Sequence, residues 1–162
     1  MSEAAPPVLL AIRALLEREG VEWRELEHGP APTCEDSARE RGEPLEIGGK
    51  CLLLKAGDSF GLFALSAARQ LDSKGLRRTL GERRLRFATA AELLEFTGLV
   101  PGSLPPFGEP VLPFQLHADE SLARGERIAF NAGSLSRSII LATEDWLRVA
   151  RPRVLSYAVP ED

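Results

Sequence analysis

A lysine stands at the entrance of an apolar segment of the chain. Gly48 and Gly49 precede Lys50, and residues 51–55 follow as a run typical of a short buried strand. A lysine that stays partly inside a fold needs a partner for its charge and would hold a cation near a cavity. A lysine in a surface loop would keep its charge in water. The local pattern leaves both interpretations open.

Two other motifs resemble known chemical sites but lack required parts. Ser59 lies in a G-x-S-x-G sequence, yet a strand is expected after it, whereas a nucleophile elbow needs a helix. A serine esterase is therefore only weakly supported. The residues before Lys50 do not form a phosphate-binding loop, because Pro44 replaces its first glycine and Cys51 replaces its Ser or Thr.

Side chains that commonly bind metals are few and scattered. The histidines and cysteines of the chain are His28, Cys34, Cys51 and His117. Their spacing matches no metal motif, so we expect neither a metal nor another cofactor. A cysteine beside apolar neighbours is usually an inert core thiol. His28 lies in a loop rich in Gly and Pro, where it could contact a substrate or simply hydrogen-bond within the loop.

Positive charge is concentrated in one stretch of the chain. The residues that share it are Lys74, Arg77, Arg78, Arg83, Arg84 and Arg86. They could meet a phosphate backbone, or form a solvated helix face partly balanced by Glu82. We see no alternation with aromatic residues that would indicate base stacking.

The overall composition is that of an ordinary globular protein. The 162 residues predict one domain, 1–162, with residues 1–7 flexible. A formal charge of −4 argues against a broad nucleic-acid coat, and we expect no DNA partner. No apolar run is long enough to span a membrane, and no signal peptide is visible. Two cysteines fit reduced thiols, so we expect a cytoplasmic protein.

Short helices and strands must position these residues. The expected helices span residues 8–18, 33–41, 74–80, 89–96, 119–124 and 143–151. The expected strands span residues 21–27, 50–55, 60–66, 84–88, 111–117, 127–131 and 138–142. Residues 97–108 form a long loop dense in Gly and Pro, which is stiff and exposes backbone N–H groups. Hairpins without regular βα alternation predict an α+β domain.

The order of several markers resembles the YbaK-type aminoacyl-tRNA deacylases, which are related to the editing domain of bacterial prolyl-tRNA synthetases. The resemblance covers residues 8–149, and no single marker is specific. The markers are His28 with Pro30, Thr33, Lys50, Gln70 to Leu76, Thr97-Gly98, the loop from Gly102 to Pro106 with Gly108, Asp119, and Asn131-Ala132-Gly133.

This resemblance implies a fold and a reaction. The fold would be a mixed, mostly antiparallel sheet curled into a partial barrel with flanking helices. The reaction would be metal-independent hydrolysis, in trans, of the ester between a wrong small amino acid and a tRNA 3′ end, typically of proline tRNA. The partner would be aminoacylated tRNA, with a synthetase as a candidate second partner. A catalytically inactive module that only binds tRNA or an amino acid is the alternative.

The resemblance also implies site residues. Lys50 matches the family's essential lysine, and Gly102 its backbone-donor glycine. Ester hydrolysis needs donors for a developing oxyanion, which the N–H groups of residues 102–104 could supply. In the family the base often comes from the substrate itself. Pocket size would be set by Leu26, Ser66 and Ser138, and further substrate contacts would come from His28, Ser103, Leu104, Pro106, Asn131 and Gly133. Some members carry an acid where Ser138 falls, so their specificity does not carry over.

Overall fold

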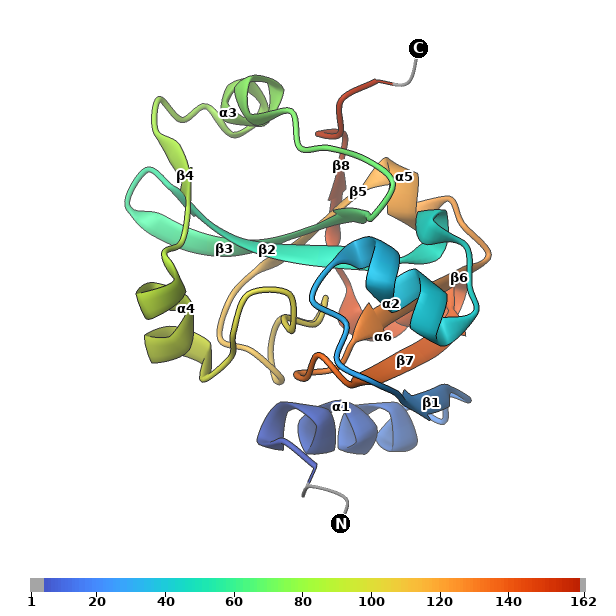
Figure 1. Ribbon diagram of the computed structural model, residues 1–162. Coiled ribbons are helices and arrows are strands. Elements are labelled where there is room, and N and C mark those ends of the chain that lie inside the picture. Colours follow the sequence, from blue (N-terminus) through green and yellow to red (C-terminus); the bar gives the residue numbers. More distant parts are fainter. Residues whose placement is uncertain (1–4, 161–162) are drawn as a thin grey trace.

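The computed structural model describes residues 5–160 (Figure 1). Its helices are α1 (Pro7–Arg18), α2 (Cys34–Arg41), α3 (Ser73–Leu80), α4 (Ala90–Thr97), α5 (Glu120–Ala123) and α6 (Thr143–Ala150), with a 3-10 turn η1 (Leu45–Ile47). Its strands are β1 (Arg24–Glu27), β2 (Gly49–Ala56), β3 (Ser59–Ser66), β4 (Leu85–Phe87), β5 (Leu116–Asp119), β6 (Arg127–Asn131), β7 (Arg137–Ala142) and β8 (Arg153–Leu155). Residues 1–4 of the segment predicted to be flexible lie outside the described range, and Pro7 already begins α1.

The strands form two sheets. In the larger sheet, β4-β2-β3-β5-β8, β2 pairs antiparallel with β3 and β4, while β3–β5 and β5–β8 are parallel. The smaller sheet, β1-β7-β6, is antiparallel, and a bridge from Gly48 to Ala129 joins the two. The predicted α+β class with mixed, mostly antiparallel pairing is confirmed. The strands within residues 5–160 close no barrel, so the predicted partial barrel is not confirmed.

Most helix ends fall where the sequence predicts them, because capping residues determine them. Thr33 accepts a hydrogen bond from the Asp36 N–H, and Asp72 accepts one from the Gly75 N–H. At Thr89 the predicted capping box is complete. No helix among residues 5–160 is long and apolar enough to cross a membrane.

The strand predicted at 111–117 is wrong over most of its length. Residues 111–114 form turns, in which the N–H groups of Val111 and Leu112 both donate to the Gly108 oxygen. Pro110 and Pro113 have no N–H to give to a strand ladder. The strand therefore starts only at Leu116 and continues to Asp119.

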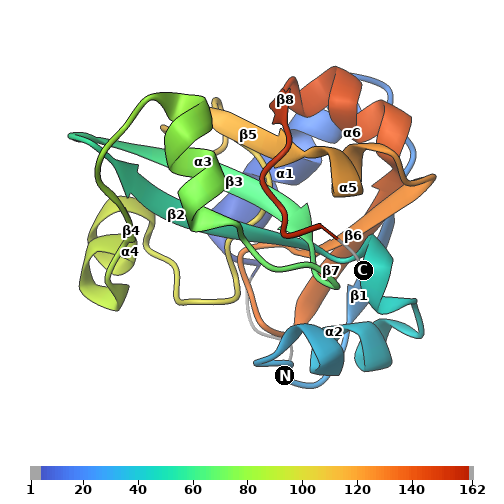
Figure 2. The ribbon, with the colours of Figure 1, turned by 90° about the horizontal axis from the view of Figure 1, so that it is seen from above.

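The β2–β3 hairpin separates two apolar cores. A large core lies between the hairpin, the smaller sheet and α1, and it includes Leu53, Phe130 and Trp146. A small core lies under α3, which covers the other face of the hairpin (Figure 2), and it joins Leu54 to Leu76. Alternate side chains of β2 therefore serve different cores, as the period of a strand requires.

The C-terminal segment closes the side of the small core. The Tyr157 hydroxyl donates to the Ala64 oxygen, and Ala158 forms a bridge with Leu71. Asp119 accepts from the N–H groups of Tyr157 and Ala158 at 2.6 and 2.9 Å. Burial alone would raise the pKa of Asp119, but these bonds and those from Ser121 hold it below its ordinary value. Asp119 thus links β5 to residues 157–158 of the C-terminal segment.

Candidate active site

A small pocket opens where β2, α2, the 97–108 loop and the end of β6 meet. Its volume is about 180 Å³. Four of the predicted site residues line it: Lys50, Gly102, Leu104 and Asn131. Cys34 and Arg41 are among the other lining residues. Segments that are far apart in the sequence therefore supply its walls.

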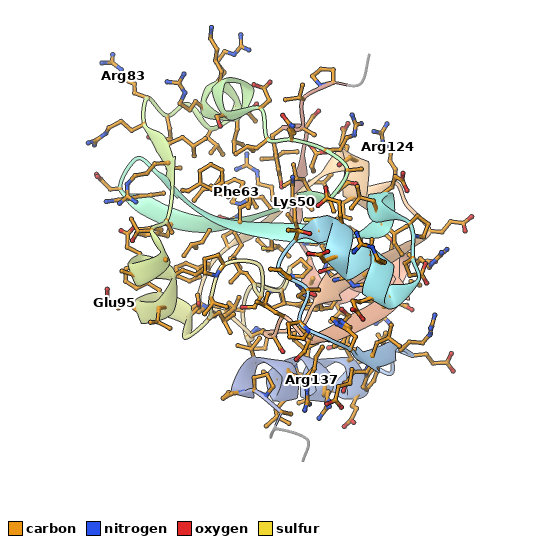
Figure 3. All side chains as sticks on the ribbon, viewed as in Figure 1. Lys50, Phe63, Arg83, Glu95, Arg124 and Arg137 are labelled. Atoms are coloured by element: carbon orange, nitrogen blue, oxygen red, sulfur yellow. The ribbon has the colours of Figure 1, made fainter. Side chains whose placement is uncertain are left out.

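Lys50 supplies the charged part of the β2 wall. It is the second residue of β2 and half-buried, with its label near the centre of the molecule in Figure 3. Its Nζ donates to the carbonyl oxygen of Arg69 at 2.5 Å. No carboxylate of residues 5–160 forms an ion pair with it. The cation therefore stands at the pocket without a negative partner, which an anionic or strongly dipolar ligand could supply.

Gly102 lies on the opposite wall in a conformation that favours glycine. Its φ is +90°, and an added Cβ would stand 3.2 Å from Leu135 Cδ2. The peptide group after it is held at both ends, because its oxygen accepts from Asn131 Nδ2 at 2.7 Å and its N–H, on Ser103, donates to the Val100 oxygen at 3.1 Å. This wall is therefore rigid.

Two N–H groups of this wall keep their donor capacity. The Ser103 oxygen accepts from the Gly133 N–H at 3.0 Å, which fixes the next peptide group as well. Within residues 5–160, neither the Gly102 N–H nor the Leu104 N–H donates to a protein acceptor. Leu104 is buried, and a buried N–H rarely lacks a partner. Both residues line the pocket, so the two N–H groups are candidate donors to a substrate oxygen.

Arg41 organises the polar side of the pocket. Its Nε donates to Ser138 Oγ at 2.9 Å and its Nη2 to Asn131 Oδ1 at 3.0 Å. Burial lowers the pKa of Arg41 to about 10, and the nearby Cys34 and Glu43 only partly oppose this. The guanidinium fixes the Asn131 amide so that its Nδ2 faces Gly102.

His28 and Ser138 lie within hydrogen-bond distance of each other. His28 Nε2 is 2.8 Å from Ser138 Oγ, and its Nδ1 is 2.8 Å from the Gly29 oxygen. A serine beside a histidine is the arrangement of an activated nucleophile. Ser138 is fully buried, however, and neither residue lines the pocket. The pair therefore supports the wall through Arg41 and Asn131 and does not face the space where a substrate would lie.

The other predicted site residues lie outside the pocket lining. Ser66 Oγ donates to the Glu46 oxygen at 2.7 Å, and the Pro106 oxygen accepts from Trp146 Nε1 at 2.9 Å. Ser103 holds its own loop through Val100, and Gly133 packs against α1. Leu26 pairs with Ser138 across β1 and β7. The substrate contacts predicted for these residues stay predictions.

Both thiols also line the pocket, but neither is activated. Burial raises the pKa of Cys34, and Lys50 and Arg41 offset it only in part. Burial likewise raises the pKa of Cys51. Protonated thiols are poor nucleophiles. No group of three or more His, Cys, Asp or Glu residues in the described part of the chain could hold a metal ion.

Sequence reasoning missed Arg41. Arg41 ends a short helix of mostly charged residues, CEDSARER, where an arginine normally points into solvent. Only the tertiary contact with β6 and β7 reveals its role. The one signal in the sequence was the helix itself, because its Thr33 cap follows directly on the His28 loop.

The chain is similar in sequence to known proteins. A family model described as the aminoacyl-tRNA editing domain matches residues 28–149. An Escherichia coli K12 protein named multifunctional Ser/Thr-tRNA deacylase ProXp-y is 39% identical over 150 residues, with 89% of each chain covered. The prolyl-tRNA editing protein ProX of Acetoanaerobium sticklandii is 23% identical over 146 residues, covering 87% of this chain and 89% of that protein.

The same fold occurs among solved structures. The crystal structure of a candidate trans-editing enzyme for prolyl-tRNA synthetase superposes with a TM-score of 0.81 and 23% identity, covering 97% of this chain and 100% of that one. The predicted relation to the YbaK-type deacylases is confirmed, as is the prediction of an enzyme that hydrolyses aminoacyl-tRNA. The family match includes both walls of the pocket, Lys50 on one and Gly102 on the other. The chain belongs to the aminoacyl-tRNA editing domain family.

Proposed function

We propose that this protein hydrolyses, in trans, the ester between a wrong small amino acid and the 3′ end of a tRNA, and that Lys50 and the Gly102 loop form its active centre. The observation that carries the proposal is the pairing of an uncompensated cation with two unpaired N–H groups, those of Gly102 and Leu104, across one small pocket. A cation on one wall and N–H donors on the other can stabilise the negative charge that develops on an ester carbonyl oxygen.

The reaction needs no covalent intermediate on the protein. Water attacks the ester carbonyl, whose oxygen accepts hydrogen bonds from the Gly102 and Leu104 N–H groups as it gains charge. Lys50 holds the carbonyl or the phosphate of the terminal nucleotide and so orients the ester. The C–O bond to the ribose then breaks, and the proton that water loses ends on the ribose oxygen. As in the family, a neighbouring ribose hydroxyl of the substrate acts as the base: it accepts the proton from water while it passes its own proton to the departing ribose oxygen. The thiols are protonated and Ser138 is buried, so these groups do not serve.

Pocket size limits the aminoacyl group. A volume of about 180 Å³ is small for a ligand site, so we infer a small side chain. Serine and threonine are the first candidates for the aminoacyl group, because the E. coli relative is named for them. Thr33 and Asn131 in the pocket also offer polar partners for a hydroxyl. Proline tRNA carrying a small wrong amino acid is the other candidate, in line with the name of the A. sticklandii relative.

The reaction also has a cellular compartment, a metal requirement and a route of tRNA delivery. We infer a cytoplasmic enzyme that needs no metal, meets aminoacylated tRNA after its release, and could receive it from a synthetase. Activity that survives a chelator would support the metal-free assignment. Activity that needs an added synthetase would indicate delivery by that partner.

A deacylation panel tests the proposal. Seryl-, threonyl-, alanyl- and cysteinyl-tRNA, including versions built on proline tRNA, are incubated with the wild-type protein and with Lys50→Ala. We expect release of at least one small amino acid by the wild type and a loss of about 100-fold or more in the variant. The absence of release from every substrate would overturn the proposal and leave a module that only binds.

A further inference from the structure

A second hollow, away from the pocket, is lined mainly by cations. Its volume is about 560 Å³, and it lies between the β2–β3 turn, α3 and β4. Five of its nine lining residues are basic and one, Asp58, is acidic. The basic ones are Lys55, Arg77, Arg83, Arg84 and Arg86, which we call the basic groove. Arg83 marks its position at the edge of the molecule in Figure 3.

Most of this charge has no strong internal partner. Arg86 is paired with Glu92 at 2.7 Å. Arg84 stands 3.7 Å from Asp58, but both side chains are over 80% exposed, so the pair contributes little. Arg77 donates only to the backbone oxygen of Arg83, and within residues 5–160 Arg83 forms no ion pair. An excess of cations in a chain of formal charge −4 indicates a place for an anionic partner.

The basic groove and the pocket are separated along strand β2. Lys50 and Lys55 belong to the same strand, five residues apart, which corresponds to about 17 Å. The ester of an aminoacyl-tRNA is at the tip of a single-stranded 3′ end, and the phosphates of the paired acceptor stem begin several nucleotides away. A substrate with its ester at Lys50 would therefore have its duplex phosphates outside the pocket, where a separate basic surface is needed to contact them.

We propose that the basic groove binds the phosphate backbone of the tRNA acceptor stem and so supplies affinity for the whole tRNA, separately from recognition of the aminoacyl ester. This inference rests on the proposed function. Contacts to phosphates position a nucleic acid without reading its sequence, so the groove would accept several tRNAs while the pocket selects the amino acid.

Substrates of two lengths test the groove. The variant is Arg83→Gln/Arg84→Gln, which removes two exposed charges that make no buried contact. The matched control is Arg18→Gln/Arg124→Gln, with Arg124 on the opposite side of the molecule (Figure 3). Each protein is assayed with full-length aminoacyl-tRNA and with a short 3′-aminoacyl oligonucleotide that has no duplex. We expect kcat/KM on the full tRNA to fall about tenfold in the groove variant alone, with the short substrate unchanged within about twofold.

Direct binding separates this inference from the proposed function. Uncharged tRNA is titrated at several salt concentrations, and the slope of log K against log salt should be shallower by about one to two in the groove variant than in the wild type. Equal slopes, or equal losses on both substrate lengths, would overturn the groove assignment. Either outcome would instead favour a protein partner at this surface, which also exposes the apolar side chains of Phe87 and Leu94. Wild-type protein that binds tRNA through the groove without cleaving any ester would overturn the proposed function alone.

Discussion

Asn131 holds Gly102 in place: its Nδ2 donates to the Gly102 oxygen across 2.7 Å, from the end of β6 to the 97–108 loop. The same amide accepts from Arg41 Nη2 on its other side, so the orientation of the amide is determined. One polar side chain therefore connects a helix, a strand and a loop.

Gly102→Ala should reduce both stability and activity. A residue with a Cβ at φ +90° costs about 1–2 kcal/mol of the free energy of unfolding, and the contact with Leu135 would shift the N–H groups of this wall. We expect deacylation to fall at least about tenfold. Gly98→Ala is the matched control, because φ there is +74° but an added Cβ meets nothing within 4 Å. Similar rates for both variants would argue against a role for the Gly102 wall.

Arg41→Lys should slow the reaction while the charge is kept. Lysine cannot reproduce the two directed donations to Ser138 and Asn131, so the Asn131 amide loses its fixed orientation. We expect a fall in kcat of about tenfold with little change in KM, and a stability loss of about 1–3 kcal/mol from thermal or denaturant unfolding. Arg39→Lys, on the same helix and ion-paired with Asp36, should change neither the rate nor the stability. A change confined to KM would indicate instead that Arg41 contacts the substrate.

Lys50→Arg should not restore the activity lost in Lys50→Ala. The guanidinium is planar and longer, so it would displace the contact with the Arg69 oxygen and enter a pocket of only about 180 Å³. Both variants should keep nearly the wild-type unfolding midpoint, because Lys50 is only half-buried. Rates are measured on the best substrate of the panel. Full activity of the arginine variant would show that charge alone suffices.

The free energy of unfolding should decrease as the pH falls below neutrality, because of the protonation of His117. Burial lowers the pKa of His117 below its ordinary 6.5, against the opposing contact with the Leu62 oxygen. The unfolded chain then binds a proton more readily than the folded chain, so the free energy of unfolding decreases as the pH falls through about 6.5 and levels off once folded His117 is itself protonated. Urea unfolding at about pH 7.5 and 5.5 measures this. His117→Gln should flatten the difference, and an unchanged slope in that variant would assign the effect to another group.

Local signals in the sequence were sufficient for most of the elements. Capping residues such as Thr89, and the apolar runs of β2 and β3, are local features of the sequence, so the sequence predicts these elements well. The strand predicted at 111–117 was mostly wrong because the apolar pattern there belongs to turns around two prolines. β8 was missed because its three residues are too short to show any period.

Some lining residues of the candidate site could be predicted from family markers, whereas others come together only through tertiary contacts. Lys50 and Gly102 follow from the resemblance, and the fold places both on one pocket. Arg41 becomes visible only when α2 packs beside β7, because nothing in its neighbours distinguishes it from Arg39. The arginines of the basic groove were recognised as a cluster, but the hollow that they line depends on how α3 and β4 meet.

The contact between Lys50 and the Arg69 oxygen gives the C-terminal segment an influence on the candidate active site. The residues after Arg69 are held by that segment, since Val159 donates to the Gln70 oxygen and Asp72 to the Tyr157 oxygen. In hydrogen-exchange terms, the amides of Asp72 and Val159 should open as one cooperative unit. Such openings would loosen the segment that follows Arg69, whose oxygen accepts from Lys50, so the protection of two amides outside the pocket should report how firmly the lysine is held.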